Sequence, residues 1–255
     1  MNKYQLFRHL HQQTQILIIP NAWDPLSARI LEQSGFSAIA TTSWGMAGYL
    51  GHSDGEHCSF TDFMAQLAPI IAAVSIPVSV DIESGYSNHI DDICQHVLQV
   101  AQLGAVGINI EDSDKSTATL RSIAQQSDII HAIKRTLIHA GFDEFFINAR
   151  TDTYLCPSPS LDNTLARAAA YQAAGADGLF IPGMSEFCAI QQLSQSVQIP
   201  LNIMSLPHCS DGHALFEHGV KRFSTGNGLF DAMVKQLTQM SDHLKASSNS
   251  QHLYA

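Results

Sequence analysis

Short apolar runs recur along the chain, and each follows a residue that interrupts a helix. Five stretches with helix-like spacing of apolar residues end in a glycine that precedes such a run, and these glycines are Gly35, Gly104, Gly141, Gly175 and Gly219. Glycine after the last helical residue supplies the left-handed conformation that ends a helix. Two more runs begin with a proline, which is tolerated at the first position of a strand, at Pro77 and Pro200. With the opening run at 16–20, the pattern predicts eight strands that alternate with helices.

Strict alternation of strands and helices is typical of one parallel sheet covered by helices. Eight such units over roughly 250 residues predict a (β/α)8 TIM barrel in the α/β class. Helical spacing extends over 24–33, 60–73, 89–102, 120–140, 161–173, 185–193, 211–217 and 228–244. We expect a further N-terminal capping helix at 2–12 that closes the bottom of the barrel. No linker divides the chain, so we predict one barrel domain over 1–245 and a flexible polar tail over 246–255.

The composition excludes several classes of binding partner and indicates a cellular compartment. The chain has 255 residues, 45% of them hydrophobic, which suffices for one large core. A net charge of −10 with only 13 Lys and Arg residues argues against nucleic acid or an anionic membrane surface as the partner. No apolar stretch is long enough to span a membrane, and the N-terminal segment is too polar for a secretory signal. Scattered cysteines without a CxxC pair indicate free thiols in a reducing cytoplasm, with neither disulfides nor a zinc site.

Carboxylates follow two neighbouring predicted strands. The segment from Pro77 to Asp112 has a strand–helix–strand pattern, with Asp81 and Glu83 after the first strand and Glu111 and Asp112 after the second. Because the strands of such a unit are parallel, these acids should meet at one edge of the sheet. Clustered carboxylates repel one another unless a cation lies among them, and a hard divalent ion, Mg²⁺ with Mn²⁺ as the alternative, prefers such oxygen ligands. The alternative is that each acid merely caps the following helix.

One basic residue stands among the predicted strand ends, where (β/α)8 barrels place their active sites. It is Arg150, after the fifth strand. A guanidinium that faces a metal site is suited to bind a substrate carboxylate in a bidentate manner. A structural salt bridge to the neighbouring acids is the alternative role. No lysine stands at a strand end, which argues against a Schiff-base aldolase.

Several motifs, in order, resemble one known family. They are NAWDPLSARILEQSGFSAIATTSWGMAGYLGHSDGE, VDIESGYSN, GINIED, NARTD and GADGLFIPG, within residues 19–230. Together they resemble the isocitrate lyase and phosphoenolpyruvate mutase superfamily. The resemblance implies an eight-stranded α/β barrel, bound Mg²⁺, and a small anionic substrate that is a 2-oxo or 2-hydroxy carboxylate or a phosphono analogue. It also implies that Asp81 contacts the metal directly and that Glu83, which is an aspartate in many relatives, and Glu111 hold it mostly through water.

The resemblance implies further roles for individual residues. The family binds the substrate carboxylate, through a side-chain hydroxyl and backbone N–H groups, at the positions that correspond to Thr42, Ser43 and Trp44. Asp54 matches the acid of a loop that closes near the reacting atoms. Arg150 matches the substrate-binding arginine, and Asn202 lies where the family places a polar residue that faces the substrate.

The loop after the fourth strand departs from the family pattern. The C–C lyases of the family carry a Lys-Lys-Cys-Gly-His motif there, whose cysteine donates or accepts a proton. The corresponding EDSDKSTATLRS has neither cysteine nor histidine, which argues against ordinary isocitrate or methylisocitrate cleavage. The mutases and phosphonopyruvate hydrolases have a loop rich in Lys and Asn, which Lys115 matches only in part. As the catalytic acid or base we therefore expect Asp54, Lys115 or His208, in that order.

The sequence thus predicts a Mg²⁺-dependent enzyme that breaks or forms a C–C bond next to a 2-oxo carboxylate through a metal-stabilised enolate. Its class would be a lyase or decarboxylase of small di- or tricarboxylates. Decarboxylation requires the fewest catalytic groups from the protein, because no base must first remove a proton. The alternatives are a P–C bond mutase or hydrolase of the phosphonopyruvate or phosphoenolpyruvate type, and a catalytically silent barrel that binds dicarboxylates. The resemblance also implies a homotetramer or homodimer in which the C-terminal helix at 228–244 is swapped between subunits.

Overall fold

Parallel strands form the centre of the structure, a computed structural model that describes residues 1–254. These strands are β1 Leu17–Ile19, β2 Asn21–Ala22, β3 Ile39–Thr41, β4 Val78–Asp81, β5 Gly107–Glu111, β8 Phe146–Arg150, β9 Gly178–Phe180, β10 Leu201–Met204 and β11 Val220–Ser224. In space their order is β1, β11, β10, β9, β8, β5, β4, β3, β2. Only Pro20, which has no N–H to donate, separates β1 from β2. They therefore act as one interrupted strand, and the sheet closes into the predicted barrel of eight positions.

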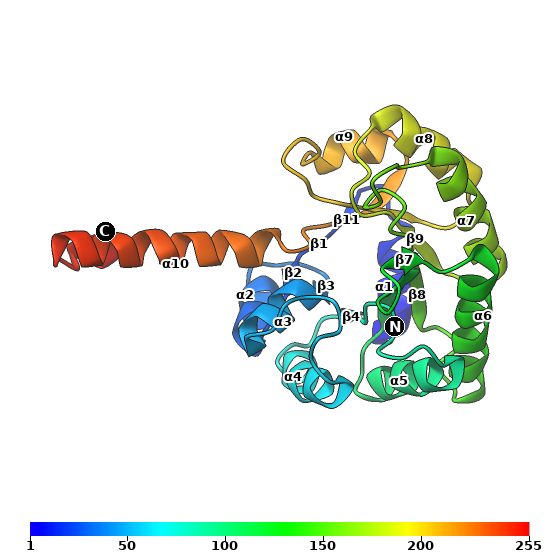
Figure 1. The fold of residues 1–255 in the computed structure, drawn as a ribbon, viewed down its shortest axis with the longest axis horizontal. Helices are drawn as coiled ribbons and strands as arrows, with labels where there is room; N and C mark the ends of the chain where they lie inside the picture. The colour runs from blue at the N-terminus through cyan, green and yellow to red at the C-terminus, as the bar shows by residue number, and fades with distance from the viewer. Residues whose placement is uncertain (255) are drawn as a thin grey trace.

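Helices surround this barrel (Figure 1). They are α1 Lys3–Leu10, α2 Pro25–Gln33, α3 Ser43–Leu50, α4 Phe60–Ala72, α5 Ile90–Gln102, α6 Ile123–His139, α7 Leu161–Ala173, α8 Phe187–Ser196, α9 Gly212–Glu217 and α10 Gly228–Ser247. Capping side chains determine where several of them begin. At α2, for example, Asp24 Oδ1 accepts a hydrogen bond from the Ser27 N–H at 2.6 Å, and Pro25 occupies the first helical position. Such a cap contributes about 1 kcal/mol to helix stability.

Asn21 ties the first and last strands together. Its Nδ2 donates to the Thr41 carbonyl of β3 at 2.7 Å, and its Oδ1 accepts from the Gly226 N–H beyond β11 at 2.9 Å. The Asn21 N–H also donates to Thr225 Oγ1 at 3.1 Å. One buried amide therefore connects both neighbours of β2 and holds the barrel closed at the end where the strands finish.

The opposite end of the barrel has an apolar floor. Phe7 of α1 is fully buried there, in one cluster with Leu17, Ile19, Ala38, Ala40, Val106 and Phe146. Burial of a phenylalanine side chain contributes about 1.5–3 kcal/mol relative to exposure. The N-terminal helix thus closes the bottom of the barrel, as the sequence predicts.

Two elements of the structure are absent from the sequence-based prediction. The first is α3, whose sequence SWGMAGYL contains two helix-weakening glycines and for which the sequence analysis predicted no helix. Close packing explains the two glycines: a Cβ at Gly45 would lie 2.9 Å from Trp23 Cβ, and one at Gly48 would lie 2.9 Å from the Phe230 ring. The second is a small antiparallel hairpin, β6 Ser113–Asp114 and β7 Thr119–Leu120, in the loop after β5.

The last helix, α10, projects away from the barrel (Figure 1). It contains no buried residue, although Phe230 at its base packs edge-on against Trp23 with 5.4 Å between the ring centres. The helix continues to Ser247, and Gln251–Tyr254 form a 3-10 helix. Most of the described part of the segment 246–255 therefore has regular structure. Its last residue, Ala255, lies outside the described residues.

A helix that crosses a bilayer needs about 20 consecutive, mostly apolar residues. Among residues 1–254, none of the helices combines the length and the apolar character that crossing a membrane requires.

Candidate active site

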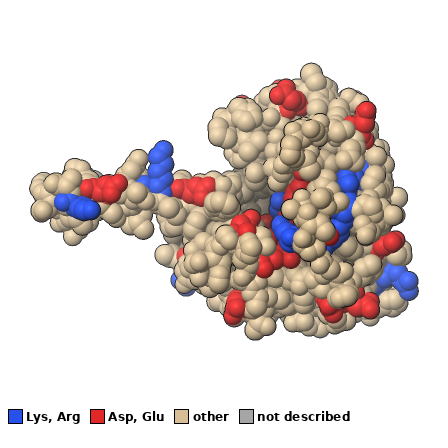
Figure 2. Space-filling model, viewed as in Figure 1, with Lys and Arg blue, Asp and Glu red and all other residues tan. Residues whose placement is uncertain are grey.

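A cavity of about 180 Å³ opens where the barrel strands end. Most strand ends contribute to its wall, which consists of Asn21, Thr42, Ser43, Trp44, Asp54, Asp81, Asn109, Arg150, Leu155, Phe180, Pro182, Met204, Ser224, Gly226 and Asn227. Figure 2 shows a hollow near the middle of the barrel with acidic and basic side chains beside it, on a face that is otherwise mostly uncharged.

Three predicted acids lie together at this end of the barrel. Asp81 ends β4, Glu83 stands two residues further, and Glu111 ends β5; their exposed fractions are 8%, 3% and 1%. Because β4 and β5 pair in parallel with Asp81 opposite Asn109, the two strands finish at nearly the same level. Ser43 Oγ donates to Asp81 Oδ2 at 3.1 Å, which connects the start of α3 to the acids.

Arg150 faces these acids from the end of β8. Its Nη1 lies 2.7 Å from Glu111 Oε2 and 3.9 Å from Asp81 Oδ2. Asp152 holds the other edge of the guanidinium, since its two oxygens accept from Nε at 2.6 Å and from Nη2 at 3.0 Å. A bidentate pair of this kind fixes the plane of the guanidinium. Arg150 therefore pairs with the acids and also lines the cavity, so the two roles considered for it are compatible.

Lys115 brings a second cation to the acids, from the hairpin of β6 and β7. Its Nζ lies 3.3 Å from Glu83 Oε2 and forms a short ion pair with Glu111 Oε1. The loop in which the sequence departs from the family pattern is thus the one that reaches the carboxylates.

Burial leaves the negative charge of the acids incompletely balanced. Burial raises the pKa of Asp81, against the attraction of Arg150, and burial together with Asp54 raises the pKa of Glu83 to about 8. Burial also raises the pKa of Glu111 to about 7, although Arg150 opposes the shift. Within residues 1–254, Glu83 Oε2 and both carboxylate oxygens of Glu111 accept no hydrogen bond of good geometry, despite their ion-pair contacts. The cluster can therefore accommodate further positive charge.

A fourth acid, Glu56, holds the loop after β4. Glu83 and Tyr86 in this loop have φ angles of 50° and 57°, in the left-handed region that such residues rarely adopt. Glu56 Oε1 accepts from the Ser84 N–H at 2.8 Å, from Ser84 Oγ at 2.7 Å and from the Tyr86 N–H at 3.0 Å. These hydrogen bonds offset backbone strain of about 1–3 kcal/mol per residue. Nothing local in the sequence connects position 56 with position 84, so the sequence analysis missed this role.

The N-terminus of α3 opens onto the cavity. Thr42 is its N-cap and accepts from the Gly45 N–H at 3.4 Å. The N–H groups of Ser43 and Trp44 stand in the first turn, where no intrahelical carbonyl can accept from them, and both residues line the cavity. Trp44 is half exposed, and its indole N–H donates to Asp231 Oδ1 of α10 at 3.0 Å. The two free N–H groups and the helix dipole suit a carboxylate.

Three further predicted residues occupy different environments. Asp54 lines the cavity, and its Oδ1 is buried without a hydrogen-bond donor in the described chain, as fits an acid near reacting atoms. His208 lies on the exposed surface with Nε2 3.1 Å from Ser185 Oγ, and it does not line the cavity. Asn202 is buried below the cavity, where its Oδ1 accepts from Asn148 Nδ2 at 3.1 Å. Neither His208 nor Asn202 lines the cavity, so their predicted roles in binding and catalysis stay predictions.

Asp112, which we expected among the clustered acids, points away from them. Its Oδ2 accepts from Arg167 Nη1 at 2.9 Å and from the Tyr171 hydroxyl at 2.8 Å, both on α7. Its Oδ1 accepts from the Asp152 N–H at 3.0 Å. Successive residues of a strand face opposite sides, so Asp112 packs against the helical layer while Glu111 faces the cavity. Its role is to connect β5 to α7.

The sequence analysis also missed a residue inside the cavity. Asn109 lines it, two positions before Glu111 on the same face of β5. The alternation of GINIE, with Gly107, Asn109 and Glu111 on one face, contains the signal that could have identified it.

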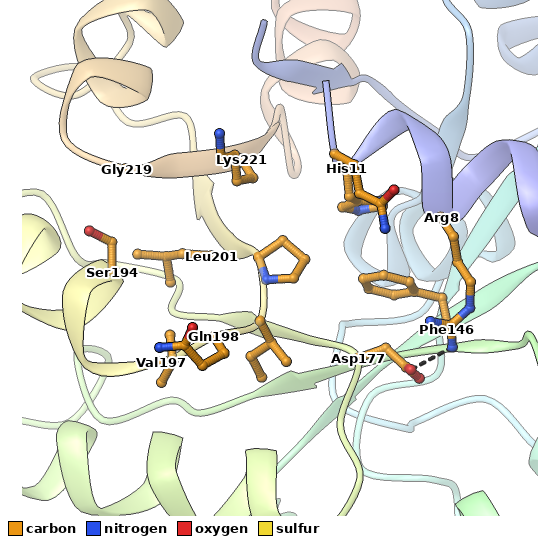
Figure 3. Close-up of a pocket in the computed structure, with 13 residues that line it drawn as sticks. Arg8, His11, Phe146, Asp177, Ser194, Val197, Gln198, Leu201, Gly219 and Lys221 are labelled. Carbon is orange, nitrogen blue, oxygen red and sulfur yellow. Dashed lines mark hydrogen bonds and ion pairs between the residues drawn. The ribbon is translucent and has the colours of Figure 1, made fainter. Parts of the chain in front are cut away.

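A second hollow, of about 370 Å³, opens at the other end of the barrel beside α1. Figure 3 shows its lining, which includes Arg8 in an ion pair with Asp177. Asp177 also pairs with Lys134 at 2.8 Å, so the acid of this hollow is already neutralised. Barrel enzymes place their chemistry where the strands end. We therefore assign the candidate active site to the smaller cavity with the acid cluster.

Comparisons with known proteins extend over almost the whole chain. The family model described as phosphoenolpyruvate phosphomutase matches residues 7–245. An uncharacterized protein of Mycobacterium tuberculosis is 38% identical over 227 residues, which are 89% of this chain and 83% of that protein. Oxaloacetate decarboxylase 1 of Pseudomonas fluorescens is 26% identical over 238 residues, 90% of this chain and 80% of that protein. The fold is also similar to the crystal structure of a Burkholderia cenocepacia protein that is provisionally named a phosphonomutase, with a TM-score of 0.90. The two chains are 38% identical, and the match covers 94% of this chain and 99% of the Burkholderia chain.

Proposed function

This chain belongs to the phosphoenolpyruvate mutase and isocitrate lyase superfamily, and from that premise we propose that it breaks or forms a C–C bond next to a 2-oxo carboxylate. The reaction that the site supports best is decarboxylation of a small diacid of the oxaloacetate type. One observation carries this proposal: Arg150 and the N-terminus of α3 both open onto a cavity of only about 180 Å³ that also borders the acid cluster. Cationic and N–H donors around so small a space suit a short carboxylate.

A divalent ion fits the chemistry of the acid cluster. Mg²⁺ and Mn²⁺ prefer carboxylate oxygens, and Glu83 and Glu111 have oxygens that accept no hydrogen bond of good geometry within residues 1–254. Among residues 1–254, however, no three side chains of the His, Cys, Asp or Glu types are arranged as a ready metal site, and Lys115 contacts both glutamates. Asp81 would bind the ion directly and Glu83 and Glu111 through water, once the Lys115 ammonium withdraws. Such an ion would supply Lewis-acid polarisation of the 2-oxo group.

The side chains around the cavity can bind and orient the substrate. Arg150 would hold one carboxylate or the developing oxyanion, and the Ser43 and Trp44 N–H groups would hold another oxygen. A preorganised donor of this kind contributes about 3–4 kcal/mol to the stability of a transition state. After loss of CO₂, a proton must reach the remaining carbon. Lys115 carries one at neutral pH, and Asp54 lines the cavity in which that proton is needed.

The loop after β5 favours decarboxylation over cleavage of larger substrates. Residues 113–122 read SDKSTATLRS and contain no cysteine or histidine that could take part in proton transfer at a substrate hydroxyl. The similarity to oxaloacetate decarboxylases supports the same choice. A second candidate is a rearrangement or hydrolysis at a P–C bond, which the 38% identity to the Burkholderia protein favours.

A substrate panel tests the proposal. We would measure release of pyruvate, glyoxylate or phosphate from oxaloacetate, 2-methylisocitrate, 2,3-dimethylmalate and phosphonopyruvate, with Mg²⁺ and with EDTA. We expect metal-dependent pyruvate formation from oxaloacetate that Asp81→Asn abolishes and that Asp91→Asn, at an exposed acid of α5, leaves intact. Phosphate release from phosphonopyruvate would establish the second candidate instead. Absence of turnover on the whole panel, with Mg²⁺-dependent oxalate binding retained, would identify a silent dicarboxylate-binding barrel.

The proposal extends to assembly. The apolar side chains that α10 exposes, among them Leu229, Met233 and Leu237, recur every four residues and form a stripe along one face. We expect this stripe to pack on a second copy of the chain.

A further inference from the structure

A polar layer crosses the interior of the barrel, between the apolar floor and the cavity. Its side chains come from five different strands, and each has an exposed fraction of 4% or less: Ser79, Asn109, Asn148, Asn202 and Arg222. Buried polar groups of this kind are kept in place by hydrogen bonds to one another. The direction of each hydrogen bond therefore decides which atom every amide presents to its surroundings.

One end of the layer is anchored by a backbone carbonyl, which can only accept. Asn202 Nδ2 donates to the Ile203 carbonyl at 3.1 Å and to Ser224 Oγ at 3.1 Å. The nitrogen and the oxygen of the Asn202 amide are thereby assigned, so its Oδ1 must be the acceptor of the contact with Asn148 at 3.1 Å. Asn148 Nδ2 is then a donor, and it also donates to Asn109 Oδ1 at 2.9 Å.

The other end is anchored by a guanidinium, which can only donate. Arg222 Nη2 lies 3.4 Å from Asn109 Oδ1 and 3.4 Å from Ser79 Oγ. Two independent donors, from Asn148 and Arg222, therefore converge on the same oxygen of Asn109. The orientation of the Asn109 amide follows from both ends of the layer. Its Oδ1 faces Asn148 and Arg222 in the barrel interior, and its Nδ2 points away from these two donors.

The Nδ2 of Asn109 has no acceptor within residues 1–254, and the residue lines the active-site cavity beside Asp81 and Arg150. Asn109 Nδ2 is also not among the polar atoms that are both buried and unpaired. It is thus a free donor at the cavity surface. Among the carboxylates nearby, a hydrogen-bond donor at this point adds attraction for an anionic oxygen.

Burial of the charged Arg222 side chain lowers the stability of the fold, which indicates that this residue is retained for a specific role. It is 1% exposed and lies over the Phe7 ring, with 5.8 Å from its Cζ to the ring centre. Its Nε and Nη1 have no hydrogen-bond partner in the described chain, and no carboxylate of residues 1–254 lies within ion-pair distance of it. Burial lowers the pKa of Arg222 to about 9, with Asp81 opposing the shift. An uncharged residue of similar size would avoid the cost of burying a charge. A guanidinium carries no acceptor, however, so Arg222 adds a second donor that can only hold the oxygen of Asn109 toward the interior.

We propose that Asn109 binds an oxygen of the carboxylate substrate through its Nδ2–H, and that Arg222 is the positioning residue that orients the Asn109 amide for this contact. The inference deepens the proposed function and rests on it, because it assigns the cavity to a carboxylate. It adds a substrate-binding donor at the base of the cavity, between Asp81 and Arg150, and makes the site selective for ligands with a hydrogen-bond acceptor at that point.

Calorimetric binding of oxalate in the presence of Mg²⁺ tests the contact. Loss of a hydrogen bond to a charged ligand should weaken oxalate binding by about ten- to a hundredfold in Asn109→Ala. Asn109→Asp, which has the same shape but presents an oxygen, should bind more weakly still. The matched control is Ser79→Ala, which removes the other contact of Arg222 and should bind within about twofold of the parent protein. An Asn109→Ala protein that binds oxalate as tightly as the parent, or a parent that does not bind oxalate, would overturn the proposal.

A double-mutant cycle tests the positioning role. Arg222→Met should weaken oxalate binding in the parent and have no further effect in the Asn109→Ala background, because Arg222 acts through Asn109. Equal weakening in both backgrounds would show that Arg222 acts through its charge or its packing and would refute the positioning role. Arg222→Lys, which keeps a donor at this position, should restore most of the affinity and serves if the methionine variant does not fold. A substrate panel without turnover, combined with these binding results, would reject the proposed reaction and leave the role of Asn109 in place.

Discussion

Lys115 lies with its Nζ 3.3 Å from Glu83 Oε2, and so connects a hairpin after β5 to an acid that follows β4. The same ammonium pairs with Glu111. It thus neutralises part of the charge that a divalent ion would neutralise, and it contacts the same two carboxylates. A metal and this ammonium cannot both remain close to the two glutamates without repulsion.

Removal of this competing cation should strengthen metal binding. We expect Lys115→Met to bind Mn²⁺ about tenfold more tightly than the parent, equivalent to about 1.4 kcal/mol. Isothermal calorimetry or the electron paramagnetic resonance signal of free Mn²⁺ would measure it. Lys134→Met, which removes a lysine paired with Asp177 at the far end of the barrel, is the matched control. Weaker Mn²⁺ binding in Lys115→Met would mean that the lysine supports the metal site.

Arg150 should be required for catalysis. Arg150→Gln removes the charge opposite Glu111 and should lower kcat/KM by about a hundred- to a thousandfold, as expected for loss of a preorganised donor. Arg150→Lys keeps the charge but loses the bidentate pair with Asp152, so we expect an intermediate loss. Steady-state kinetics on the substrate from the panel would measure both. Arg135→Gln, at an exposed position of α6, is the control, and an Arg150→Gln enzyme as active as this control would remove Arg150 from the mechanism.

Stability should fall in acid because of His11. This residue is 5% exposed and stacks on Phe146 with 4.4 Å between the ring centres. Burial, and then the charge of Arg222, lowers the pKa of His11 from 6.5 to about 3. The unfolded chain therefore takes up this proton first as the pH falls, so the contribution of His11 to stability is complete above pH 6.5 and is lost toward pH 3, by about 1.4 kcal/mol per pH unit.

Urea unfolding at several pH values would isolate this contribution. Between pH 6.5 and 4.5, the free energy of unfolding of the parent should fall relative to His11→Phe by about 2–3 kcal/mol. His9→Gln, at an exposed position near the end of α1, should lose stability with falling pH as the parent does. If the parent and His11→Phe lose stability in parallel over this range, His11 is not the group responsible.

Charges on the apolar stripe of α10 should reduce assembly. Met233 and Leu237 are 42% and 63% exposed, and we expect the double substitution Met233→Glu with Leu237→Glu to lower the oligomeric state in sedimentation velocity. The matched control is Thr238→Glu with Gln239→Glu, which adds the same charge at exposed positions of α10 away from the stripe. A parent protein that sediments as a monomer, or a stripe variant that assembles like the control, would contradict the proposed contact.

Local patterns in the sequence determined the barrel and the edge at which its chemistry is found. Strand periodicity, glycines after helices and capping residues are short-range features, and they place α7 at Leu161–Ala173, the range expected from the sequence alone. The same features place Asp81, Glu111 and Arg150 at strand ends, and the parallel topology then brings them together.

Tertiary structure alone decided how these groups are used. The glycines of helix α3 are needed because Trp23 and Phe230 pack closely against them, and Lys115 reaches the acids because its loop folds into a hairpin. The orientation of Asn109 depends on Arg222, which lies more than a hundred residues further along the chain. Local preferences carry no information about such contacts, because each one depends on which side chains the closed barrel places opposite one another.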